Sequence, residues 1–329
     1  MTVSSAPGKV YLFGEHAVVY GEPAIPCAIQ RRATVRVDPR SDGVTRVEAG
    51  DLTLDGFTVE YTQSVEDHPE IDVPEHLLSA ATGYIDVALE QACNAVADPA
   101  TGFDVAIESE IPLGAGLGSS AAVAVATIDA ATRAMGTELP PERIAELAYR
   151  TEREVQDGQA SRADTFCSTM GGAVRVEGDE CRNIEAPELP FVIGFDGGAG
   201  ETGELVAGVR KLRERFDFAA ETIRAIGNLV RAGERAVERG DRRELGRLMN
   251  FNHGLLEALG VSSYTLDEMV WAARRAGADG AKLTGAGGGG CIVALGDGEQ
   301  LLTALDATAV CVDAFQAELD RNGVRAEGA

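Results

Sequence analysis

The chain has 329 residues, which is long enough for about two domains, and its hydrophobic fraction of 45% is that of a globular protein. Asp and Glu outnumber Lys and Arg by 53 to 29, and the net charge of −24 disfavours nucleic acid or an anionic membrane as a partner. There is no run of 18 apolar residues, and the N-terminal segment is unlike a signal peptide, so we expect a cytoplasmic protein without a membrane span. The six scattered cysteines form no CxxC pair, which is typical of a reduced compartment and indicates no zinc site.

Lysine occurs only three times, at positions 9, 211 and 282, and the rest of the 29 Lys and Arg residues are arginine. So few lysines beside so many carboxylates predict a halophilic protein, adapted to a cytoplasm rich in salt. Lys211 lies in a charged run that is typical of a solvated helix face. Lys9 precedes an apolar β-type run and Lys282 precedes a glycine cluster, so these two are the lysines for which we expect specific roles.

The first half of the chain combines short strands with helices. Apolar residues at helical spacing predict a helix over 76–96, and further helices are expected over 119–135 and from Pro140 to about Gln156. We expect residues 157–165 to form a loop. Period-2 alternation predicts strands over 10–13, 34–37, 44–48, 57–61, 103–107 and 173–177.

Two prolines within residues 183–191 mark the expected boundary between an N-terminal domain, 1–186, and a C-terminal domain, 187–329. Beyond the boundary, strands are expected over 191–195 and 291–295, and the tail is expected to turn at Asn322-Gly323. Long amphipathic helices are expected around 203–239, 241–258 and 264–277, with a short one after the last strand.

The segment 111–122, IPLGAGLGSSAA, joins three glycines and two serines to the start of an Ala-rich helix. A glycine turn at a helix N-terminus presents backbone N–H groups and the positive end of the helix dipole, which together bind phosphate. The segment is not a Walker A loop, because no Gly-Lys-Ser/Thr ends it. An ordinary glycine turn with a capping serine is the structural alternative.

A second glycine cluster, GAGGGG at 285–290, matches the G-x-G-x-x-G pattern of dinucleotide-binding oxidoreductases. That pattern needs a helix directly after it, whereas the sequence here predicts a strand, so we disfavour this alternative.

Three segments, 6–24 (APGKVYLFGEHAVVYGEPA), 111–122 and 282–294 (KLTGAGGGGCIVA), together resemble the superfamily of galactokinases, homoserine kinases, mevalonate kinases and phosphomevalonate kinases. GEHAVVYG at 14–21 and MNFNHGLLEALGVSS at 249–263 are most similar to the mevalonate kinase family, and residues 158–172 resemble its archaeal version. The resemblance implies a two-domain α+β kinase fold with the active site in a cleft. It also implies ATP-dependent phosphorylation of (R)-mevalonate to 5-phosphomevalonate, in isoprenoid and lipid biosynthesis, with a sugar, homoserine or phosphomevalonate as alternative substrates.

The resemblance assigns a role to each matching position. Asp164 is expected to accept the proton of the substrate hydroxyl or to position that hydroxyl, and Lys9 to place a positive charge beside it and the γ-phosphate. The expected Mg²⁺ ligands are Ser120 and Glu152. Glu154 is an alternative to Glu152, because this chain carries one extra residue near Asp157 relative to the archaeal pattern, which shifts the alignment. The ATP phosphates are expected on Gly114, Ala115, Gly116, Leu117, Gly118, Ser119 and Ser120. Mevalonate is expected against Glu15, His16, Thr202, Gly285, Ala286 and Gly287.

Each assignment has a structural alternative. Asp164 could cap a loop, Glu152 could lie on a solvated helix face, and His16 could be a packing residue. A nucleotide-binding module without catalytic activity is therefore a third hypothesis for the whole protein. The resemblance also implies a homodimer as one assembly, although no residue in the sequence identifies the contact.

Overall fold

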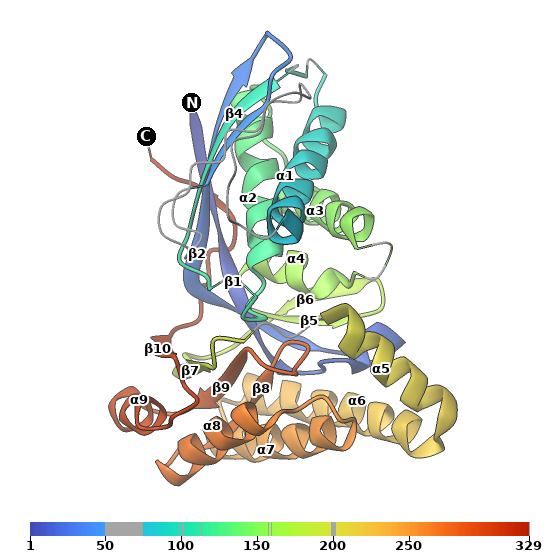
Figure 1. Cartoon of the computed structure of the whole chain (residues 1–329), viewed down its shortest axis with the longest axis vertical. Coiled ribbons are helices and arrows are strands. Elements are labelled where there is room, and N and C mark those ends of the chain that lie inside the picture. The colour runs from blue at the N-terminus through green and yellow to red at the C-terminus, as the bar shows by residue number, and fades with distance from the viewer. Residues whose placement is uncertain are drawn as a thin grey trace.

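The computed structural model of the chain describes residues 1–49, 75–97, 99–100, 102–112, 114–156, 158, 160–198 and 202–328. These residues form two sheets with helices packed against them, and the expected α+β architecture is confirmed (Figure 1). The strand expected over 57–61 lies outside the described residues. Among the residues described, no helix combines the length and apolar character needed to cross a bilayer.

The first sheet is built around two long antiparallel strands, β1 and β2, and the strand order is β11-β1-β2-β4-β3 with the β5–β6 hairpin attached to β2. β1 is buried from Ser4 to Phe13, so its polar side chains need partners inside the protein. The strands are β1 (Thr2–Phe13), β2 (Ile25–Arg40), β3 (Arg46–Ala49), β4 (Gly102–Ser109), β5 (Ala173–Glu177), β6 (Glu180–Ile184) and β11 (Arg325–Ala326).

Four helices lie together on one side of this sheet (Figure 1): α1 (Glu75–Ala95), α2 (Ser119–Ala134), α3 (Pro141–Val155) and α4 (Arg162–Met170). The many alanines of α2 are buried, because small side chains allow the helix to pack closely on β1 and β2. The loop expected over 157–165 is wrong from Arg162 onward. The side chain of Ser161 accepts a hydrogen bond from the backbone N–H of Ala163, and this cap starts α4 before Asp164.

The second sheet has the antiparallel order β10-β7-β9-β8. Its strands are β7 (Phe191–Phe195), β8 (Gly280–Thr284), β9 (Cys291–Leu295) and β10 (Asp313–Ala317), and its helices are α5 (Thr202–Arg215), α6 (Asp217–Glu238), α7 (Arg242–Ala258), α8 (Tyr264–Arg275) and α9 (Gly298–Asp306). The single helix expected over 203–239 is wrong, because Phe216 is extended and separates α5 from α6. A strand, β9, follows the second glycine cluster as expected, so the oxidoreductase alternative fails.

The two sheets are joined by the last residues of the chain. β10 pairs with β7 in the second sheet, whereas β11 pairs with β1 in the first, so the turn at Asn322-Gly323 connects sheets instead of closing a hairpin. The N-terminal and C-terminal ends therefore lie near each other (Figure 1). Apart from β11, the strands of the first sheet precede residue 186 and those of the second sheet follow it. The exact division into domains remains a prediction.

Candidate active site

The first glycine segment lies directly against β1. Gly114, Gly116 and Gly118 all have left-handed backbone conformations, with φ of 69°, 76° and 75°. Between them, the side chains of Ala115 and Leu117 are buried, so the apolar residues anchor the segment and the glycines face outward. Gly118 directly precedes α2, so the segment ends at the N-terminus of this helix. A glycine segment that leads into a helix N-terminus has the features of an anion site, because it presents backbone N–H groups together with the positive end of the helix dipole.

Lys9 of β1 joins this segment to Asp164 of α4. Its ammonium donates to the carbonyl oxygen of Gly116 at 3.0 Å and lies 3.0 Å from Oδ2 of Asp164. Its backbone N–H donates to the carbonyl oxygen of Leu117 at 2.8 Å. A Cβ on Gly118 would lie 2.9 Å from Cγ of Lys9, so only glycine leaves room for this lysine. The Lys9 side chain is 4% exposed and that of Asp164 27%, so the carboxylate faces the open side of the pair.

Glu152, near the end of α3, provides a second carboxylate at this place. It is buried, and burial together with the nearby charge of Asp164 raises its pKa well above the ordinary value, whereas Lys9 opposes the shift. Glu154, the alternative metal ligand, is exposed and lies two residues away on another side of the helix. Ser120, in the first turn of α2, contacts the hydroxyl of Tyr84, which also accepts a hydrogen bond from Gln156 at 2.7 Å.

The second glycine segment, 285–290, packs on the first. A Cβ on Gly285 would lie 3.2 Å from the Cα of Gly116, and one on Gly290 would lie 3.1 Å from the carbonyl oxygen of Ala115. Asp196 fixes the end of this segment, since its Oδ1 accepts from the backbone N–H of Gly290 at 2.8 Å. A side chain at Gly285 or Gly290 would therefore prevent the close contact between the backbones of the two glycine segments.

The segment 14–16 contacts the second glycine segment and the strand β8 that precedes it. Glu15 is buried and forms an ion pair with the buried Lys282, and its Oε2 accepts a hydrogen bond from Asn252 at 3.4 Å. Burial raises the pKa of Glu15 and lowers that of Lys282. His16 contacts the carbonyl oxygen of Ala286 through Nε2 at 2.8 Å, and burial lowers its pKa, so the neutral ring donates this hydrogen bond.

The structure thus brings together segments that are far apart in the sequence, namely 8–16, 114–120, 282–290, and the two positions Glu152 and Asp164. Thr202 does not share these contacts: it is exposed at the start of α5. The same helix approaches the second glycine segment through Leu205, whose Cδ1 would lie 3.0 Å from a Cβ on Gly288. Sequence reasoning missed Tyr11, whose hydroxyl donates to Oδ1 of Asp164 at 2.7 Å. The alternation of β1 could have indicated it, because residues 9 and 11 of a strand share a face.

Comparison with protein families agrees with this geometry. A model of the GHMP kinases N terminal domain matches residues 81–172, and a model of the GHMP kinases C terminal matches residues 234–310. A galactokinase galactose-binding signature matches residues 2–39. The chain is 46% identical over 305 residues to a mevalonate kinase of Pyrococcus horikoshii, covering 91% of this chain and 89% of the relative. The chain belongs to the GHMP kinase family.

Other relatives match over almost the whole length of this GHMP kinase. A mevalonate kinase of Thermococcus gammatolerans is 41% identical, with 99% of this chain and 98% of the relative covered. A crystal structure of mevalonate kinase is 29% identical with a TM-score of 0.80, covering 98% of this chain and 100% of that one. The Methanococcus jannaschii mevalonate kinase structure has a TM-score of 0.79 at 29% identity, over 96% of this chain and 98% of that one.

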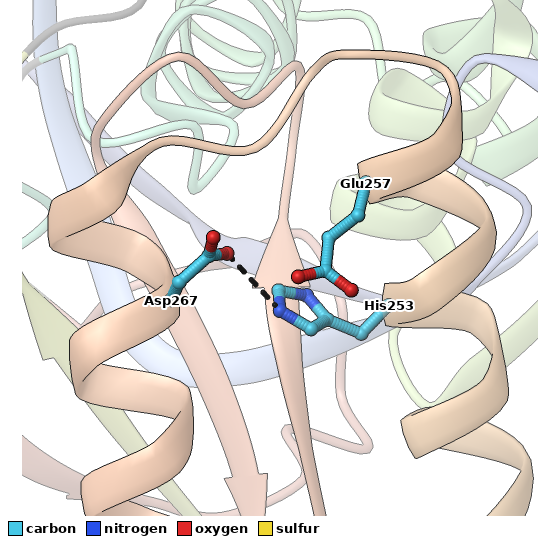
Figure 2. A group of neighbouring side chains, drawn as sticks. All are labelled: His253, Glu257 and Asp267. Carbon is cyan, nitrogen blue, oxygen red and sulfur yellow. Dashed lines mark ion pairs between the residues drawn. The ribbon is translucent and has the colours of Figure 1, made fainter.

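A second group of titratable residues in this GHMP kinase lies between α7 and α8 (Figure 2). His253, Glu257 and Asp267 offer ligand atoms within 4.8 Å of one another, and Nε2 of His253 lies 3.3 Å from Oδ1 of Asp267. Nδ1 of His253 accepts a hydrogen bond from the backbone N–H of Leu283 at 3.4 Å, so the proton of the neutral ring is on Nε2, the atom that faces Asp267. The charge of Arg274 acts on both His253 and Glu257. A protonated Nε2 facing Asp267 and the nearby positive charge of Arg274 favour an electrostatic cluster over a metal site.

This cluster predicts a pH dependence of stability. Burial, reinforced by Arg274, lowers the pKa of His253 from 6.5 to about 4. The folded chain therefore binds fewer protons at this site than the unfolded chain, so the contribution to stability is complete above pH 6.5 and is lost as the pH falls towards 4. We expect a contribution of up to about 3 kcal/mol.

His253→Asn is the matched variant, because an asparagine Oδ1 can still accept from Leu283 but does not titrate. Urea denaturation from pH 7 to pH 4 at constant KCl should show a steeper loss of unfolding free energy in the wild type than in the variant. Parallel curves for the two proteins would contradict the prediction.

Proposed function

We propose that this GHMP kinase transfers the γ-phosphoryl group of ATP to the hydroxyl of (R)-mevalonate, giving 5-phosphomevalonate and ADP for isoprenoid synthesis. One observation carries the chemistry: Lys9 lies 3.0 Å from both Asp164 and the carbonyl oxygen of Gly116, at the N-terminus of α2. A cation, a carboxylate and an anion-binding segment at one point are what phosphoryl transfer to an alcohol requires. The substrate follows from the mevalonate kinases to which the chain is 41–46% identical.

In the proposed reaction, ATP places its phosphates along Gly114–Ser120, where the backbone N–H groups and the dipole of α2 bind them. Asp164 accepts the proton of the attacking hydroxyl or holds that hydroxyl in line with the γ-phosphate. Lys9 stabilises the negative charge that spreads over the transferred group. On ATP binding, the ammonium of Lys9 can exchange its contact with the Gly116 carbonyl for a phosphate oxygen without leaving Asp164.

The residues present fit Mg²⁺. Glu152 is a buried carboxylate whose pKa is raised by burial and by Asp164, so a divalent cation beside it would supply the missing positive charge. Ser120 adds a hydroxyl at the start of α2, and Mg²⁺ prefers a few such oxygens with waters and phosphates. We propose Ser120 and Glu152 as its ligands. The ion would neutralise the charge of the β- and γ-phosphates.

The substrate side of the proposed site is formed by Glu15, His16, Thr202 and Gly285–Gly287. The ion pair of Glu15 with Lys282 and the hydrogen bond of His16 to Ala286 support this proposal, because they connect the first segment to the second glycine segment. We infer that mevalonate binds where these segments meet, with its reacting hydroxyl towards Asp164.

The test is an ADP-release assay with purified protein, ATP and Mg²⁺ at high KCl, using (R)-mevalonate, galactose, homoserine and 5-phosphomevalonate as separate acceptors. Mevalonate is expected to give the highest kcat/KM. A higher value for another acceptor would overturn the substrate but not the kinase, whereas absence of turnover with all four would support a non-catalytic nucleotide-binding module.

We also propose that the protein acts in a salt-rich cytoplasm. The net charge of −24 predicts repulsion within the folded chain at low ionic strength, which salt would screen. The melting temperature is therefore expected to rise between about 0.05 M and 2 M KCl, as measured by differential scanning fluorimetry. An unchanged or lower melting temperature in KCl would contradict this. A homodimer is the proposed assembly, for which light scattering at the same KCl concentrations is the direct measurement.

A further inference from the structure

Both oxygens of the Asp164 carboxylate have partners on β1. Lys9 lies 3.0 Å from Oδ2, and the hydroxyl of Tyr11 donates to Oδ1 at 2.7 Å. The two side chains are also in contact with each other, since the ammonium lies 4.6 Å from the centre of the Tyr11 ring. A carboxylate bound at one oxygen can still rotate about its last side-chain bond, whereas partners at both oxygens fix its plane.

We propose that Tyr11 is a positioning residue for phosphoryl transfer, which holds the plane of the Asp164 carboxylate so that a free lone pair of Oδ2 faces the substrate hydroxyl. Each carboxylate oxygen can accept two hydrogen bonds, so the contacts with Lys9 and Tyr11 leave capacity for the substrate. The inference rests on the proposed role of Asp164, but it does not depend on which alcohol is the substrate.

Tyr11 is itself held in place by the second sheet. Its backbone N–H donates to Oγ1 of Thr284 at 2.7 Å, and its carbonyl oxygen accepts from Lys282 at 3.4 Å. Both of these residues belong to β8, at the entrance to the second glycine segment. Tyr11 therefore links the position of that segment to the orientation of Asp164.

The phenol is suited to donate a hydrogen bond to Asp164. Tyr11 is 6% exposed, and burial together with the charge of Asp164 raises its pKa well above the ordinary value. It therefore keeps its proton throughout the working pH range. The alternative is that Tyr11 only fills the small apolar cluster that its ring shares with Ala24, Ala28, Ala163, Cys167, Val174 and Val176.

Tyr11→Phe separates these roles, because it keeps the ring and its packing but removes the hydroxyl. We expect kcat to fall about 10- to 100-fold while KM for ATP changes less than about twofold, since small misplacements of reacting groups cost rate rather than nucleotide binding. Tyr149→Phe is the matched control. Tyr149 lies on α3, and its ring packs under the guanidinium of Arg162, which is in α4 like Asp164. The kcat of this variant should remain within twofold of the wild type.

A double-mutant cycle tests whether Tyr11 acts through Asp164. In an Asp164→Asn background, Tyr11→Phe should change the residual rate less than about twofold. A wild-type-like kcat for Tyr11→Phe, or an equal loss in both backgrounds, would overturn the proposal. The acceptor is the alcohol that the wild type phosphorylates best, so failure of the mevalonate assignment and failure of this inference are separate results.

Discussion

Asp164→Asn is expected to lower kcat about 10³-fold while ATP affinity stays within about threefold of the wild type. Asparagine retains an oxygen acceptor for the hydroxyl of Tyr11 or the ammonium of Lys9, so the neighbourhood keeps its shape. It cannot accept the proton of the substrate hydroxyl, and it removes the negative charge that pairs with Lys9. Initial rates of ADP release measure the loss, and calorimetry with a non-hydrolysable ATP analogue measures the affinity.

Asp179→Asn is the control for that experiment. Asp179 forms an ion pair with Arg162 of α4 at 3.1 Å, but its side chain is 93% exposed and it is not one of the residues proposed for the reaction. This variant should keep kcat within twofold of the wild type. If Asp164→Asn also retained turnover within tenfold of the wild type, Asp164 would be a helix-start residue and not part of the reaction.

Lys282→Met is expected to lower the free energy of unfolding by about 3–5 kcal/mol, because it leaves the carboxylate of Glu15 buried without its partner. Lys282 is 0% exposed and Glu15 is 2% exposed, so water cannot replace the lost ammonium. Denaturant unfolding at constant KCl measures the change.

Two further variants make this prediction specific. Glu15→Gln combined with Lys282→Met removes both charges and should recover at least half of the lost stability. Lys211→Met changes the exposed lysine of α5 and should stay within about 0.5 kcal/mol of the wild type. A loss below about 1 kcal/mol in Lys282→Met would mean that the pair does not stabilise the contact between the sheets.

The parts of the site that could be predicted have local sequence signatures. The glycine segment before α2 was recognisable because its residues are contiguous, and Lys9 stood out because lysine is so rare in this chain. Their convergence with Asp164 was predicted only from the family resemblance. The start of α4 was missed although Ser161 offered a capping signal, because the nearby glycine favoured a loop.

The remaining features depend on contacts between distant residues. Glu15 and Lys282 are separated by 267 positions, and no local pattern pairs a carboxylate in the turn after β1 with a lysine in β8 of the other sheet. The pairing of β11 with β1 likewise joins the two ends of the chain. No glycine or proline marks the break between α5 and α6 at Phe216, so the helical periodicity of the sequence predicted one continuous helix there. The roles of the individual site residues stay predictions until the variants are measured.

The distribution of the lysines has a practical consequence. Lys9 and Lys282 are buried, whereas Lys211 lies on the surface of α5. Of the three lysines, only Lys211 is therefore accessible to an amine-reactive dye or resin on the folded protein, and it is not one of the residues of the proposed reaction centre. The enzyme could thus be immobilised or labelled in a defined orientation with unmodified commercial chemistry, without first removing competing lysines.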